Sequence, residues 1–212
     1  MAIIQDPSTT NVATVDPTFK ALRTVLYGQK QSYRTALRSG TIAAATAAGF
    51  VYSFRNTGSK IATLLSVRLG MQILSAYTQG NITFTLVRVN GMLLAADTGG
   101  TVGAYGNTQK IRYDVQNAND AELRISSTTV LGAGIGTVED ANAFASIQHD
   151  LPSAALVAQP MKEFLNYSAY SSMIKIYPGE GFRIKNTAYA ATGTSNVVVQ
   201  VEWAEEDNEL KG

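Results

Sequence analysis

The sequence contains no cysteine and only one histidine, His149. Without cysteine, disulfide bonds and thiol chemistry are excluded, and the composition gives no indication of the redox compartment. A zinc site is not expected either, because zinc in proteins is bound mainly by cysteine and histidine. The sequence therefore predicts no metal site and no cofactor.

Charged residues are also scarce, at 16% of the chain against roughly 25% in an average soluble domain. Lys and Arg together number 17 and Asp and Glu 16, which leaves a formal net charge of +1. This balance provides no electrostatic attraction toward nucleic acid or an anionic membrane, so we expect neither as a partner. A surface of low charge suits packing against other proteins, because little charge has to be desolvated.

Long hydrophobic runs are missing as well. No run reaches the ~18 apolar residues of a transmembrane helix. Residues 1–15, MAIIQDPSTTNVATV, lack the basic and continuous apolar regions of a signal peptide. We therefore expect the protein to be made in a cytoplasm and not to be exported by the usual route.

Catalytic signatures are absent too: there is neither a GxSxG nucleophile motif nor a P-loop. Asp150 follows His149, which formally allows a Ser–His–Asp triad, but nothing marks a nucleophile and we interpret His149 as structural. Carboxylates such as Asp114, Glu122 and Glu139 could in principle form a glycosidase pair. Acids placed in this way are more typical of solvated charges, and the sequence predicts no enzyme.

What is present, from residue 31 onward, is an apolar pattern with a period of two, which is typical of half-buried strands. Turn clusters such as AYTQGN (residues 76–81) and PGEG (residues 178–181) separate the alternating segments. About eight short strands with this punctuation predict an all-β domain over residues 29–205, an antiparallel jelly-roll-like β-sandwich. The predicted strands are residues 33–37, 50–54, 65–71, 82–86, 121–126, 174–176, 182–184 and 197–203.

Three stretches interrupt this pattern. Residues 41–56, TIAAATAAGFVYSFRN, are interpreted as a strand end, a small-residue connection and the next strand, with a subunit contact as the alternative. Residues 91–109 contain many glycines and are predicted to form a long loop. Residues 128–165 show little periodicity, and VEDANAFASI (residues 138–147) fits either a helical turn or a strand.

The ends of the chain differ from the domain between them. Residues 1–28 are predicted to form an N-terminal arm, in which VDPTFKALRTVLYG (residues 15–28) fits a short amphipathic helix or a tight extended segment. Residues 206–212 form an acidic C-terminal tail. The apolar stripe of the arm either packs on its own domain or contacts a neighbouring subunit. The residues predicted to make that contact are Phe19, Leu22, Arg23 and Tyr27.

Several segments together resemble small β-rich structural proteins from the virions of tailed bacteriophages. These segments are ALRSGTIAAATAAGFVYSFR, LLSVRLGM, AELRISSTTVLGAG and PGEGFRIKNTAYAATGTSNVVVQVEWAEED. The resemblance covers roughly residues 15–205 and implies a capsid decoration protein or another component of the virion, without giving its position in the particle. The first hypothesis is a capsid decoration or cement protein that bridges capsid subunits. On this hypothesis the partners are the major capsid protein or other virion proteins. Closed symmetric assembly is the default for such proteins, and a sandwich with an arm suits a homo-oligomer such as a trimer, or a pseudo-symmetric vertex.

Two other functions remain open at this point. Ten tyrosines, with Tyr105 in the long loop, fit a tail-associated adhesion module that binds a host surface glycan. A glycan hydrolase with a carboxylate pair is the third hypothesis.

Overall fold

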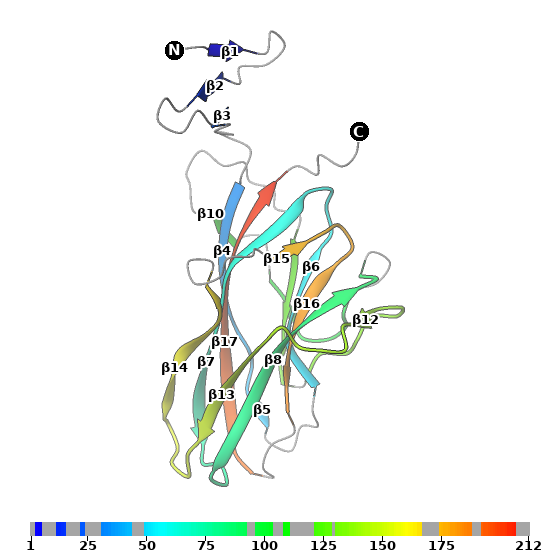
Figure 1. Ribbon diagram of the computed structural model, residues 1–212. Helices are drawn as coiled ribbons and strands as arrows, with labels where there is room; N and C mark the ends of the chain where they lie inside the picture. The colour runs from blue at the N-terminus through cyan, green and yellow to red at the C-terminus, as the bar shows by residue number, and fades with distance from the viewer. Residues whose placement is uncertain are drawn as a thin grey trace.

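The computed structural model describes residues 3–5, 12–15, 22–23, 31–43, 49–92, 96–103, 108–110, 121–128, 130–166, 174–187 and 192–206. Every regular element in these ranges is a β-strand, as Figure 1 shows, which confirms the predicted all-β class. None of the described segments forms a helix long and apolar enough to span a bilayer.

In the part of the chain that the structure describes, the first of two large sheets contains seven antiparallel strands. In spatial order, its main path is β10 (Thr108–Lys110), β4 (Gln31–Arg38), β17 (Thr194–Glu206), β7 (Ile61–Ser75) and β14 (Ala158–Asn166). Two further strands pair beside this path, β15 (Ile174–Ile176) with β7 and β5 (Ile42–Ala43) with β17.

Seven of the described strands, again antiparallel, form the second sheet, which packs against the first. Its main path is β12 (Val138–Glu139), β8 (Gly80–Asn90), β16 (Gly181–Asn186), β6 (Gly49–Asn56), β11 (Ala121–Ile125) and β9 (Thr101–Val102). The seventh strand, β13 (Ala145–Leu151), pairs with β8. The two sheets form the predicted sandwich, whereas the jelly-roll arrangement is not confirmed.

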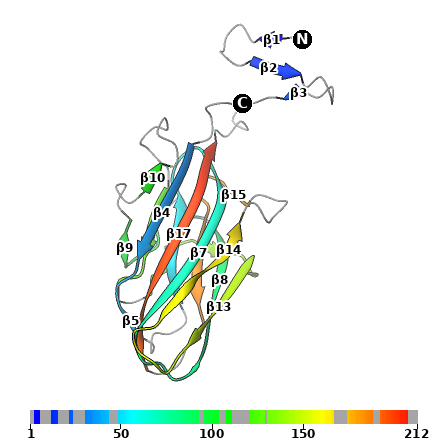
Figure 2. The same cartoon turned by 90° about the vertical axis from the view of Figure 1, so that its left-hand side faces the viewer.

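A third, small sheet belongs to the N-terminal arm. Its strands are β1 (Ile3–Gln5), β2 (Val12–Val15) and β3 (Leu22–Arg23), which pair with one another and with no other described strand. In both views this sheet lies beyond one end of the sandwich (Figures 1 and 2). Leu22 and Arg23 are therefore extended rather than helical, and the rest of the 15–28 segment lies outside the described residues apart from Val15 in β2.

The core between the two large sheets is aromatic and aliphatic. Trp203 of β17 is fully buried and stacks on Tyr33 of β4 with ring centroids 5.5 Å apart. Phe54 of β6 meets the Trp203 ring edge-on at 5.4 Å and stacks on Phe182 of β16 at 5.1 Å. Because these rings come from both sheets, the cluster fixes how the sheets face each other.

A β-bulge in β7 changes which of two adjacent leucines lies in the core. Alternation through the predicted strand 65–71 puts Leu65 on the same face as Val67 and Leu69, but Leu64 is buried in the core instead and Leu65 is only half-buried. The pairing with β17 shows the cause: Trp203 lies opposite Leu64 and Glu202 opposite Ser66, so Leu65 is an extra residue. Such a residue moves the inward face of the strand by one position.

The irregular segments also form strands. VEDANAFASI contributes β12 and the start of β13, and not a helical turn. Strand β14 has two register shifts and contains Pro160, which explains why it shows no clear period and lies at a sheet edge. Part of the predicted 91–109 loop contributes the short strand β9, and β10 begins at its end.

Candidate functional site: a clamped turn over the second sheet

Arg183 lies on the outer face of the second sheet, yet it is buried. Its neighbours Phe182 and Ile184 in β16 belong to the core between the sheets, so Arg183 points to the opposite side. There its guanidinium carbon lies 4.5 Å from the centre of the Phe50 ring. The side chain is buried because it makes contacts with the segments 96–103 and 130–140, which cross this face.

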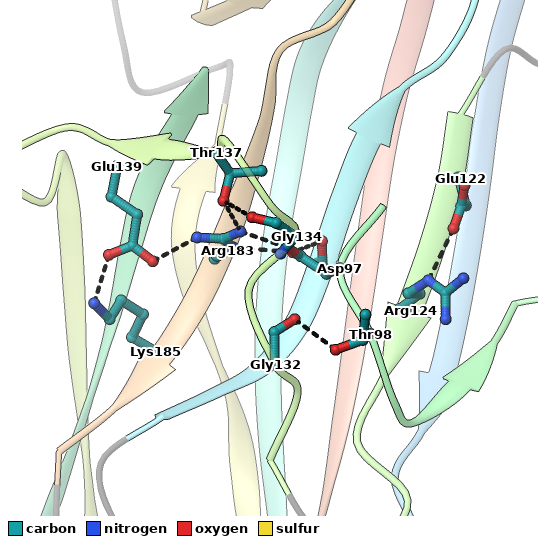
Figure 3. A network of polar contacts seen from close by, with 11 residues as sticks. Asp97, Thr98, Glu122, Arg124, Gly132, Gly134, Thr137, Glu139, Arg183 and Lys185 are labelled. Carbon is teal, nitrogen blue, oxygen red and sulfur yellow. Dashed lines mark hydrogen bonds and ion pairs between the residues drawn. The ribbon is translucent and has the colours of Figure 1, made fainter. Parts of the chain in front are cut away.

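Asp97 supplies the main counter-charge. Arg183 donates from Nε to Asp97 Oδ2 at 2.9 Å and from Nη2 to Asp97 Oδ1, which makes a bidentate pair (Figure 3). The same carboxylate accepts from Ser53 Oγ at 2.6 Å and from the Gly134 N–H at 2.9 Å. Burial by itself raises the pKa of Asp97, but the hydrogen bonds from Arg183, Ser53 and Gly134 hold that pKa below its ordinary value.

Glu139 and Lys185 extend the network toward solvent. Arg183 Nη1 lies 2.8 Å from Glu139 Oε1, and Lys185 Nζ lies 2.5 Å from Glu139 Oε2. Burial raises the pKa of Glu139, and hydrogen bonds from Lys185 and Arg183 outweigh this effect and lower it. Arg183 Nη2 also donates to Thr137 Oγ1 at 2.9 Å. One buried guanidinium thus holds two acidic residues and a threonine, which come from two segments of the chain, 96–103 and 130–140.

These contacts clamp an exposed turn. Thr137 donates to the Gly134 carbonyl from its N–H at 3.3 Å and from its Oγ1 at 2.8 Å, which closes a four-residue turn. Gly136 has φ of 78°, in the left-handed region that glycine tolerates best. Ile135 at the tip is 89% exposed, and Val138 just after the turn is 64% exposed. We call residues 134–138 the clamped turn.

The clamped turn presents two exposed aliphatic side chains on a backbone that is held by hydrogen bonds. Its backbone is fixed from below by the Asp97–Arg183 pair, so docking would order few additional dihedral angles. Its two exposed aliphatic side chains, Ile135 and Val138, would gain free energy on burial against a partner. Among the described residues, the other exposed large apolar side chains are Val102, Leu156 and Met161.

The predicted contact residues of the arm are only partly described. Leu22 and Arg23 lie in β3, opposite Val15 and Thr14 of β2. Phe19 and Tyr27 lie outside the described residues. The predicted subunit contact therefore stays a prediction.

Two of the three carboxylates in the hydrolase hypothesis, Glu122 and Glu139, lie far apart. Glu122 on β11 is paired with Arg55 at 3.2 Å and with Arg124 at 2.8 Å. Glu139 on β12 is separated from it by β8, β16 and β6, a distance on the order of 19 Å at ~4.8 Å per strand. Glycosidase carboxylates lie roughly 5–10 Å apart, so these two do not form such a pair. Asp114 lies outside the described residues.

His149 is buried, and within the described ranges it contacts no serine or aspartate side chain in the manner of a Ser–His–Asp triad. Its Nε2 lies 3.3 Å from the Leu69 carbonyl, and its Nδ1 has no hydrogen-bond partner among the described residues. Asp150 instead accepts from the side-chain amide of Asn81 at 3.0 Å. The contacts of His149 are with the Leu69 carbonyl and the Phe84 ring, and the interpretation of this histidine as structural stays a prediction.

The glycan hypothesis depended on tyrosines. Tyr33, Tyr52 and Tyr77 are buried, so their rings cannot stack on a sugar. Tyr105 lies outside the described residues, so its role stays a prediction.

The sequence does not predict that Arg183 is buried, nor that it contacts Asp97 and Thr137. In the sequence, Arg183 does not differ from other single arginines in strands, such as Arg55 and Arg88, and Asp97 lies in the predicted 91–109 loop. One signal was available: Val87 and Val89 occupy outward positions of β8, opposite Arg183 and Gly181 of β16. Both valines are buried, so another part of the chain must cover the outer face of the sheet at this point.

Comparison with protein-family models and with curated proteins finds no match for the chain. No group of three His, Asp or Glu residues able to hold a metal ion occurs in the part of the chain that the structure describes.

Proposed function

We propose that the chain is a non-enzymatic structural protein of a tailed-bacteriophage virion, a capsid decoration or cement protein that bridges capsid subunits. The observation that carries this proposal is the clamped turn, which holds Ile135 and Val138 exposed above a buried ion pair. A rigid apolar projection suits a contact that must persist, because little conformational entropy is lost when it docks. The resemblance of residues 15–205 to virion proteins points to the same class.

The N-terminal arm supports assembly as well. Strands β1, β2 and β3 have only 3, 4 and 2 residues, too few to enclose a core of their own. Such a sheet gains stability by packing on another surface, and a neighbouring copy or a capsid subunit would provide one. The partners proposed here are the major capsid protein or other virion proteins, together with further copies of the chain in a homo-oligomer such as a trimer.

The sandwich is suited to bearing load. Strand β17 pairs with β4 on one side and with β7 on the other for most of its length. Load along these long strands would be shared over many backbone hydrogen bonds in parallel, as a protein that stiffens a shell requires.

The test has two parts. Light scattering of the full chain and of a chain lacking residues 1–28 reports whether the arm holds an oligomer, and co-sedimentation with capsids assembled without the protein reports particle binding. The double substitution Ile135→Asp and Val138→Asp should abolish particle binding. Val102→Asp, at the far edge of the second sheet and also exposed, should leave it intact. A protein that binds no particle component and stays monomeric at high concentration would refute the proposal.

A further inference from the structure

Strands β13 and β14 form a seam between the two large sheets. β13 pairs with β8 of the second sheet and β14 pairs with β7 of the first, and the two strands lie side by side at one side of the sandwich (Figures 1 and 2). Residues 152–157 connect the two strands, and a backbone hydrogen bond holds each end of this connection. Tyr77 N donates to the Pro152 carbonyl at 3.3 Å, and Ile73 N donates to the Val157 carbonyl at 2.8 Å.

His149 ties the two sheets together at this seam. It belongs to β13, lies opposite Ile82 of β8 and is fully buried. Its ring stands edge-on to Phe84, with centroids 6.0 Å apart. Nε2 lies 3.3 Å from the carbonyl oxygen of Leu69, which belongs to the other sheet. Since a carbonyl only accepts, Nε2 carries the proton, and the bare Nδ1 faces a buried region where none of the described residues accepts a bond from it.

The charged groups around His149 come from two strands. On β14, the ammonium group of Lys162 donates a hydrogen bond to the carbonyl of Gln148, the residue that precedes the histidine. On β13, Asp150 follows the histidine and bonds to Asn81. Burial lowers the pKa of His149 most, Lys162 lowers it further, and the bond to Leu69 and the charge of Asp150 raise it by less. β7 and β8 present the Leu69 carbonyl and the apolar Ile82 and Phe84.

We propose that His149 is an acid-sensitive latch, which keeps the β13–β14 seam closed while its imidazole is neutral and opens it on protonation. A proton on Nδ1 would create a buried cation beside Lys162 with no acceptor from the described residues. The imidazolium is accommodated only when the seam separates and water reaches the ring. Opening exposes the inner sides of both strands, while β7 and β8 remain paired within their sheets. This inference does not depend on the proposed function.

The sign of the pH dependence follows from the lowered pKa of His149. The closed seam is fully stable above the ordinary histidine pKa of about 6.5, where the ring is neutral in both states. As the pH falls below that value, the open state gains the proton and the closed state does not. The opening equilibrium should therefore rise by up to about tenfold per pH unit, until the pKa of the closed state is reached.

His149 is the only histidine in the chain, so its NMR titration needs no assignment. The experiment follows this titration together with amide hydrogen exchange of residues 145–151 and 158–166 between about pH 7.5 and 5, corrected for intrinsic exchange. In the wild type, both segments should lose protection below about pH 6.5. In His149→Gln the amide can still donate to Leu69 but does not titrate, so protection should persist.

Lys162→Gln is the second variant. Without this ammonium the pKa of His149 should rise toward its ordinary value, and the acid-induced loss of protection should become smaller. A histidine that titrates near 6.5 with unchanged exchange would overturn the latch, as would equal acid opening in wild type and His149→Gln. An unchanged titration in Lys162→Gln would also contradict it.

Discussion

Arg183 and Asp97 lie 86 positions apart in the chain, yet they form a buried bidentate ion pair with Nε 2.9 Å from Oδ2. Breaking a buried pair by removing one partner is costly, because the other charge stays buried without compensation. The pair joins the 96–103 segment to the central strand β16 of the second sheet, and through Gly134 it also holds the clamped turn.

The first prediction concerns this pair. Asp97→Asn should lower the free energy of unfolding by about 3 kcal/mol, the lower end of the usual range, because Glu139 still contacts Arg183. The control is Glu163→Gln, which removes a half-exposed partner of Arg68 and should cost about 1 kcal/mol or less. Urea unfolding of the three proteins measures both values. Equal losses of unfolding free energy in the two variants would show that the buried pair stabilises the fold no more than the half-exposed pair does.

The second prediction is acid sensitivity from the same carboxylate. The native pKa of Asp97 lies below its ordinary value, so ionised Asp97 stabilises the fold above about pH 3.9. This contribution is lost as the pH falls from the ordinary pKa through the lower native one. The stability of Asp97→Asn should therefore fall less steeply than that of the wild type between about pH 4 and pH 2. Unfolding free energies measured across this range test the prediction, and parallel curves would contradict it.

Much of the fold could be predicted from the sequence, because a period of two survives wherever a strand has one buried face. The alternation of Val197, Val199, Val201 and Trp203 marked β17, and all four residues are buried. The period fails where register shifts occur. β14 shifts twice against β7, so its inward positions do not follow a constant spacing.

The candidate site could not be predicted in the same way. An outward arginine in a strand has the same local pattern whether it faces water or a covering loop. Only the long-range pairing that places Asp97 and Thr137 over Arg183 distinguishes these cases. Local periodicity contains no information about that pairing.

The third prediction compares two glycines with almost the same backbone conformation. Gly136 has φ of 78° and Gly91 has φ of 76°. A Cβ added at Gly136 would meet no atom within 4 Å, whereas one added at Gly91 would lie 2.6 Å from the Gly136 carbonyl oxygen. Gly136→Ala should cost about 1 kcal/mol from the left-handed backbone alone. Gly91→Ala should cost about 3 kcal/mol or more, because the backbone must also move. Chemical denaturation measures both costs, and equal values would mean that the close approach at Gly91 is easily relieved.

The fourth prediction tests the bulge in β7. Leu64 and Leu65 are adjacent and chemically identical, but only Leu64 lies in the core. Leu64→Ala should lower the free energy of unfolding by about 3 kcal/mol through lost burial and a new cavity. Leu65→Ala removes a half-buried side chain and should cost about 1 kcal/mol. Uninterrupted alternation from Leu65 through Val67 and Leu69 predicts the opposite order. Equilibrium unfolding in urea decides between them, because a larger loss for Leu65→Ala would place the register shift elsewhere in the strand.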